Sequence, residues 1–157
     1  SRHWLELARW CTEHNWPVNF HCTRPIGDHP LAVATPLEDY AAMVREHTDL
    51  TFIFAHWGAG LPQLLQDAPP DNAYYDCSAS PLLYSNEIFR EVMAQAGAEK
   101  ILFGSDYPLR IYPRESRQAE MKRFIANIRS SAGLPPETIG KLLGGNFERL
   151  LRQKVPR

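Results

Sequence analysis

Apolar residues along the chain occur in two patterns, short continuous runs and helical spacing, and the two alternate in a regular order. Continuous runs predict buried strands over residues 18–21, 51–55, 73–77 and 100–104. Helical spacing predicts helices over 2–14, 36–47, 86–96, 115–131, 136–143 and 146–153, and a short helix beginning near residue 62. Asn146 is placed to cap the last helix. Strands that alternate with helices indicate an α/β fold with a parallel sheet and right-handed crossovers.

The length of the chain and the number of strand–helix units set the size of the fold. Residues 1–157 are one domain's worth of chain, and we expect a single domain. Four such units are half of the eight that a (β/α)8 barrel of about 250 residues contains. The chain begins with Ser1, and residues 2–15 look like the middle of a strand–helix series, so we expect a fragment of a longer protein. A lone four-stranded sheet would leave two open edges and one uncovered face.

The composition narrows the classes of partner. Hydrophobic residues make up 44% and charged residues 22%, which is ordinary for a globular domain. The 17 Lys and Arg and the 18 Asp and Glu give a net charge of −1, which argues against nucleic acid or an anionic membrane as the main partner. The three cysteines, Cys11, Cys22 and Cys77, are scattered without metal-finger spacing, and a reducing, cytoplasmic location fits them.

Three polar residues stand at or just after the ends of apolar runs. His21 ends the first run, His56 follows the second, and Asp106 follows the fourth. Because the carboxyl ends of parallel strands open on the same edge of a sheet, we expect these side chains to share one space. Two imidazoles and a carboxylate there predict a metal-centred active site. The alternative is three unrelated buried polar residues, each hydrogen-bonded to its own surroundings.

Other residues near the same rim carry weaker signals. Trp57 and Tyr107 immediately follow His56 and Asp106, so we expect them either to shape a pocket wall or simply to pack. Asp76 also lies near the rim, but its position is more typical of a loop-capping residue than of a catalyst. Cys77 ends a strand too, and because small buried cysteines are common, it is not assigned as a nucleophile.

Four segments resemble the amidohydrolase superfamily, namely residues 18–22, 54–58, 101–108 and 145–151. Within it they are most similar to the amidohydrolase-related (amidohydrolase 2) branch, which includes the aminocarboxymuconate-semialdehyde decarboxylase-like enzymes. The resemblance covers nearly the whole chain, in order. It implies a (β/α)8 barrel with a mononuclear, usually zinc, centre. This chain would then hold the C-terminal half of the barrel, strands five to eight.

The resemblance also implies roles for the strand-end residues. His21 resembles the fifth-strand metal ligand, and His56 resembles the sixth-strand histidine that contacts substrate or the attacking water. Asp106 resembles the eighth-strand aspartate that binds the metal and handles a proton. A metal ion lowers the pKa of a bound water towards ~7, and a neighbouring carboxylate can take that proton. Trp57 and Tyr107 would border the substrate beside His56.

One part of the family pattern is missing, and it leaves the function open. The first-strand His-x-His or Glu-x-His pair occurs nowhere in the 157 residues. The favoured interpretation is a metal-dependent hydrolase that acts on a C–N or C–O bond of a small molecule. A second is non-oxidative decarboxylation of a carboxylated ring or semialdehyde, and a third is a catalytically silent half-barrel. The expected partners are a small-molecule substrate and either the missing N-terminal half of the barrel or a second copy of the chain.

Overall fold

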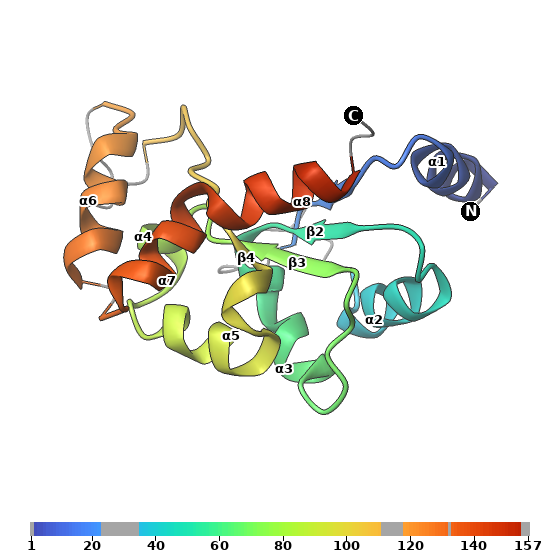
Figure 1. Cartoon of the computed structure of the whole chain (residues 1–157), viewed down its shortest axis with the longest axis horizontal. Helices are drawn as coiled ribbons and strands as arrows, with labels where there is room; N and C mark the ends of the chain where they lie inside the picture. The colour runs from blue at the N-terminus through green and yellow to red at the C-terminus, as the bar shows by residue number, and fades with distance from the viewer. Residues whose placement is uncertain (1, 23–34, 111–117, 132, 155–157) are drawn as a thin grey trace, which may run out of the picture.

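The computed structural model describes residues 2–22, 35–110, 118–131 and 133–154. Its centre is a parallel sheet of four strands in chain order (Figure 1). The strands are β1 (Val18–Phe20), β2 (Phe52–Phe54), β3 (Ala73–Asp76) and β4 (Ile101–Leu102). Each strand pairs in parallel with the next one along the chain. The predicted parallel α/β arrangement is therefore confirmed.

Helices connect the strands and cover the sheet. They are α1 (Arg2–Glu13), α2 (Leu37–Glu46), α3 (Leu61–Leu65), α4 (Ser80–Leu83), α5 (Ile88–Ala96), α6 (Met121–Ser131), α7 (Pro136–Gly140) and α8 (Asn146–Lys154). Short turns η1 (His56–Gly60), η2 (Ala98–Lys100) and η3 (Lys141–Gly145) precede α3, β4 and α8. The first part of the predicted helix 115–131 lies outside the described residues, and the described part begins at Met121.

One face of the sheet packs against α2, α3 and α5, which lie below it in Figure 1. Because side chains alternate along a strand, every second residue points into this helix layer. Aromatic rings form a row across the strands, with ring centroids 6.0 Å apart for Phe20 and Phe54 and 6.0 Å apart for Phe54 and Tyr75. This row, buried at Phe54 and Tyr75 and partly buried at Phe20, holds the strands next to one another and so positions the residues that follow them.

The opposite face of the sheet is partly covered by α8. Ile53, Tyr74 and Leu102 come from three neighbouring strands and form a second buried cluster with Leu150 of α8. In Figure 1, α8 runs along the side of the sheet opposite α3 and α5. The expectation of an uncovered face is therefore wrong for the part of the sheet that Leu150 covers.

Asn146 anchors α8 to the last strand. Its side-chain amide donates hydrogen bonds to the carbonyl oxygens of Ala98 at 2.8 Å and Ile101 at 2.7 Å. Asn146 is buried, and its own backbone is already helical. The expectation that it caps the helix is wrong, because its amide group satisfies two carbonyls beside β4 instead.

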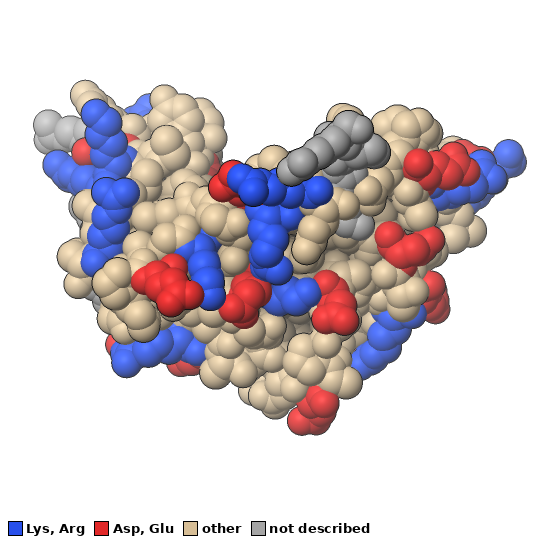
Figure 2. Space-filling model, viewed as in Figure 1, with Lys and Arg blue, Asp and Glu red and all other residues tan. Residues whose placement is uncertain are grey.

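The edges of the sheet are β1 and β4. In the described part of the chain, each of these strands has a strand neighbour on one side only. On the face shown in Figure 2, basic side chains lie interspersed with acidic ones. Lys141 forms an ion pair with Glu99 at 3.3 Å. No helix in the described ranges has the length and apolar character needed to cross a membrane.

Candidate active site

The predicted site residues lie together where the strands end. The rings of His21 and His56 meet edge to face, with centroids 4.9 Å apart and planes at 89°. Nδ1 of His56 lies 4.0 Å from Oδ2 of Asp106. These residues follow β1, β2 and β4, so the parallel strands bring them to the same edge of the sheet. His56 is the member that contacts both of the others.

The three side chains differ in access to solvent. The side chain of His56 is 5% exposed and that of Asp106 is 32% exposed. His21 is exposed, and its carbonyl oxygen accepts a hydrogen bond from the Tyr40 hydroxyl at 3.3 Å. The site therefore has a buried imidazole at its centre, flanked by one imidazole and one carboxylate that solvent can reach.

The backbone directly after β2 forms a left-handed turn, His56–Gly60. The φ angles of its three non-glycine residues lie between 54° and 60°. An L-residue in this conformation is destabilised by roughly 1–2 kcal/mol, so the surroundings must hold it there. Gly58 has φ 65°, and a β-carbon on it would lie 2.9 Å from Cδ1 of Tyr75. The turn thus combines strain with close packing at the site, a combination that is common where function requires it.

A buried carboxylate holds the first residue of this turn. Oδ1 of Asp76 accepts hydrogen bonds from the backbone N–H of His56 at 3.2 Å and that of Ser78 at 2.9 Å, and from the hydroxyl of Ser78. Asp76 is 8% exposed, and these donors compensate the burial of its charge. Asp76 does hydrogen-bond within its own loop, as a loop-capping residue would, but its contact with His56 was not predicted. The feature of the sequence that could have indicated this contact is the position of Asp76 at the end of β3, between the strands that precede His56 and Asp106.

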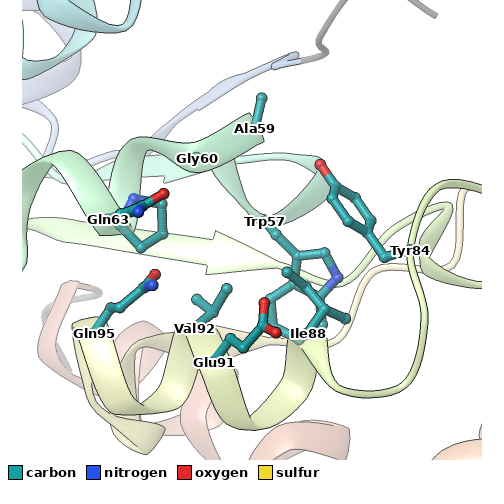
Figure 3. A pocket seen from close by; sticks show the side chains of 10 residues that line it. Trp57, Ala59, Gly60, Gln63, Tyr84, Ile88, Glu91, Val92 and Gln95 are labelled. Carbon is teal, nitrogen blue, oxygen red and sulfur yellow. The ribbon is translucent and has the colours of Figure 1, made fainter.

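Trp57 points into the helix layer, toward Ile88 and Val92 of α5 (Figure 3). Its indole is 1% exposed, and Nε1–H donates a hydrogen bond to Oγ of Ser80 at 2.9 Å. The ring packs edge to face on Phe89 of α5, with centroids 5.0 Å apart. Of the two roles expected for Trp57, this placement favours packing over contact with a substrate.

Tyr107 lies on the surface beyond Asp106. Its side chain is 63% exposed, and its backbone N–H donates a hydrogen bond to Oγ of Ser105 at 3.2 Å. Asp106 itself has φ 59°, and its carbonyl oxygen accepts a hydrogen bond from Leu109 N–H at 2.9 Å. Tyr107 is therefore on the outer side of a tight turn, and its predicted role in binding substrate stays a prediction.

A cavity of about 280 Å³ lies on the helix side of the left-handed turn, between it and α5 (Figure 3). Its apolar wall is formed by Trp57, Ile88 and Val92, and polar groups of Gln63, Glu91 and Gln95 also line it. None of the three strand-end residues His21, His56 and Asp106 lines this cavity. It is a separate hollow from the candidate active site.

The cysteines near the strand ends are poor nucleophiles. Burial raises the pKa of the Cys77 thiol to about 12 and that of Cys22 to about 11. The Cys77 thiol also donates a weak hydrogen bond to the carbonyl oxygen of Gly104, at 3.6 Å. Both groups therefore stay protonated at neutral pH, when a nucleophile would need the thiolate form.

Two donor groups of the predicted metal site lie among the described residues. His21 and Asp106, the predicted ligands, have the imidazole and carboxylate groups that divalent ions bind. Among the residues the structure describes, however, no group of three or more His, Cys, Asp or Glu side chains is arranged to hold a metal ion. The donors present fit a metal centre as members of a larger set, and do not complete one in the described part of the chain.

A sequence profile places this chain in a known family. The profile of the amidohydrolase family (amidohydrolase 2) matches residues 1–153, and the chain belongs to this family. The resemblance first seen in the strand-end segments is thereby confirmed. No curated protein sequence matches the chain.

Solved structures of other proteins share this fold, and three of them illustrate the likeness. An uncharacterised TIM-barrel protein from Bordetella bronchiseptica is 21% identical with a TM-score of 0.67, and the match covers 96% of this chain and 50% of that one. Dihydroxybenzoic acid decarboxylase from Polaromonas sp. JS666, with bound manganese, is 15% identical with a TM-score of 0.65, and the match covers 94% of this chain and 53% of that one. A putative 2-pyrone-4,6-dicarboxylic acid hydrolase from Pseudomonas putida is 18% identical with a TM-score of 0.64, and the match covers 98% of this chain and 57% of that one. The chain thus spans about half the length of these proteins.

Proposed function

We propose that the chain supplies the proton-handling part of the active site in a divalent-metal-dependent barrel enzyme. In this proposal the enzyme hydrolyses a C–N or C–O bond of a small molecule. The observation that carries the proposal is the contact between His56 Nδ1 and Asp106 Oδ2, at 4.0 Å, with the ring of His21 against that of His56. Membership of the amidohydrolase family supports it.

Each of the three residues has a distinct role in the proposed reaction. His21 and Asp106 would hold the metal ion together with ligands from outside the described residues. When bound, the ion would supply a water of lowered pKa. Asp106, which solvent can reach, accepts a proton, and the buried His56 contacts the substrate or the attacking water. Zinc is the ion we favour, and manganese is the alternative because the Polaromonas decarboxylase binds it.

Decarboxylation is the second candidate. It is supported by the likeness to dihydroxybenzoic acid decarboxylase, while the likeness to the putative 2-pyrone-4,6-dicarboxylic acid hydrolase supports hydrolysis. Both of those names describe carboxylated ring compounds, so we propose the same class of substrate for this chain. The same proton carrier serves both reactions, because hydrolysis removes a proton from water and decarboxylation returns one to carbon.

The remainder of the barrel is the proposed partner. We propose that β1 to β4 correspond to strands five to eight of the barrel and that the outer edges of β1 and β4 pair with the other four strands. The support is that each edge strand has a neighbour on one side only in the described residues, and that the chain covers half of the similar structures. A cytoplasmic location is part of the proposal, supported by the three free, buried cysteines.

Turnover by the full-length protein tests the proposal. A 2-pyrone-4,6-dicarboxylate and a dihydroxybenzoate are supplied with Zn²⁺ or Mn²⁺, and ring opening and CO₂ release are followed separately. Asp106→Asn keeps the shape of the side chain but removes its charge, so turnover should fall by roughly 10²–10⁴-fold. Asp67→Asn, at an exposed aspartate in a loop, is the matched control and should turn over normally. Near-normal turnover in Asp106→Asn would remove this residue from the mechanism.

A further inference from the structure

We propose that Asp76 and Ser78 are positioning residues that place a proton on Nδ1 of His56 and so leave Nε2 of the neutral ring unprotonated. The inference rests on the proposed function, in which His56 contacts substrate or water. It is carried by the hydrogen bonds around the ring and backbone of His56, which link the ends of the neighbouring strands β2 and β3.

The atoms around Nδ1 decide which ring nitrogen carries the proton. Nδ1 of His56 lies 3.0 Å from the carbonyl oxygen of Ser78 and 3.0 Å from its Oγ. Oδ2 of Asp106, another acceptor, lies 4.0 Å away. A carbonyl oxygen can only accept a hydrogen bond, so the bond to Ser78 requires a proton on Nδ1. In the neutral ring, Nε2 is then unprotonated.

The Ser78 hydroxyl beside Nδ1 could either donate or accept a hydrogen bond, and Asp76 determines which of the two it does. The Ser78 hydroxyl has a single proton and donates it to Oδ1 of Asp76, so its lone pairs face His56. The backbone N–H of His56 also points to this oxygen pair, with Asp76 Oδ1 at 3.2 Å and Ser78 Oγ at 3.3 Å. Without Asp76, the hydroxyl would be free to donate to Nδ1 and would favour a proton on Nε2 instead.

This arrangement specifies what His56 can do. An unprotonated Nε2 can accept a proton from water or from a substrate hydroxyl, whereas a protonated Nε2 could only donate one. Asp76 touches the ring only through Ser78 and the backbone, so it acts by orienting another residue. Hydrogen-bond partners of this kind commonly fix the tautomer and orientation of functional histidines.

The tautomer can be observed directly, without an activity assay. Long-range ¹H–¹⁵N NMR spectra of the imidazoles are recorded on the 157-residue chain at about pH 8, above the ordinary histidine pKa of ~6.5. The signal of His56 is assigned by its loss in His56→Asn. We expect a protonated Nδ1 and an unprotonated Nε2 in the wild-type chain. A proton on Nε2 in the wild-type chain would overturn the inference, whether or not any variant folds.

Three variants test the part played by Asp76. Asp76→Ala should convert the signal to a mixture of tautomers, and a folded Asp76→Ala chain with the wild-type tautomer would exclude Asp76 as a positioning residue. Asp76→Asn retains an acceptor oxygen and should keep the wild-type tautomer; conversion to Nε2–H there would contradict the hydrogen-bond argument. Ser80→Ala removes the hydroxyl of another buried serine, the first residue of α4, which contacts Trp57, and should leave the His56 signal unchanged.

The two proposals can fail separately. A wild-type tautomer with the proton on Nδ1, in a protein that turns over neither type of substrate, would refute the proposed function alone. Turnover by a protein with the proton on Nε2 would refute the positioning role alone. In the active full-length protein, Asp76→Ala should lower kcat while KM stays near the wild-type value, because Asp76 does not touch the substrate.

Discussion

Gly104 approaches Asp76 so closely that a β-carbon on Gly104 would lie 3.0 Å from Cγ and 3.0 Å from Oδ1 of that carboxyl group. The same β-carbon would lie 3.1 Å from Cβ of Ser78. Gly104, two residues after β4, therefore leaves room for the carboxylate that accepts a hydrogen bond from the backbone of His56. A side chain at this position would press on that carboxylate.

Gly104→Ala should destabilise the fold. The added methyl group would displace Asp76 or the end of β4, and overpacking of this kind typically costs about 1–3 kcal/mol of unfolding free energy. Urea unfolding followed by circular dichroism measures the change. Gly140→Ala is the control, because Gly140 is helical with φ −61° and nothing lies within 4 Å of an added β-carbon. That variant should be unchanged or more stable by roughly 0.4–1 kcal/mol, and equal losses in the two variants would contradict the prediction.

His21→Asn should release more metal than His56→Asn. His21 is proposed as a ligand and is exposed at the strand end, whereas His56 is buried and already engaged with Ser78. Metal content of the full-length protein after gel filtration gives the comparison, with His3→Asn as the control at a histidine whose side chain is 96% exposed. Equal metal loss at His21 and His56 would cancel the division of roles between them.

The isolated chain should self-associate. Phe147 and Leu151 of α8 are 44% and 39% exposed, and they flank Leu150, which packs on the sheet. Sedimentation velocity over a range of concentrations should show dimers or larger species, because open strand edges and exposed apolar groups favour association. The double variant Phe147→Ser, Leu151→Ser should weaken it more than Leu64→Ser, at a 44% exposed leucine of α3. A compact wild-type monomer that binds no hydrophobic dye is the contrary result.

The free energy of unfolding should decrease in alkaline solution because Cys77 is buried as a thiol. Its pKa is raised by burial from 9.0 to about 12, so the unfolded chain loses this proton at a lower pH than the folded chain does. The contribution of the buried Cys77 thiol to the unfolding free energy is complete below about pH 9. It declines towards pH 12, by roughly 1.4 kcal/mol per pH unit for one fully shifted group. Urea unfolding at several pH values from 8 to 10.5 measures the slope. Cys77→Ala should have a shallower slope, and an unchanged slope would contradict the argument.

Much of the fold follows from the sequence because buried parallel strands have a simple signature. The strand 52–54 is apolar at every position and buried at every position, as doubly covered strands are. The strand predicted over 100–104 is shorter in the structure, Ile101–Leu102. Its pairing partners in β3 are Tyr75 and Asp76, and β3 ends there, so the residues after Leu102 have no strand to pair with in the described sheet.

The site was predictable in part for the same reason. His56 and Asp106 each follow a recognisable strand, so their meeting could be expected from the topology. The role of Asp76 could not, because it depends on a three-dimensional register that places one oxygen against the backbone of His56 and the Ser78 hydroxyl. The direction of the Trp57 ring could not be predicted either, because it results from a left-handed turn. The only indication of that turn in the sequence is the glycines that it contains.

The chain-order sheet also has a consequence for how the protein forms during synthesis. β2 can dock on β1, β3 on β2, and β4 on β3 as each leaves the ribosome, so none of these strands waits for a later one to provide its place. A later contact is that of Asn146, which binds the carbonyls of Ala98 and Ile101. Until that residue has been translated, β4 and the turn before it lack the two hydrogen bonds that tie them to the final helix.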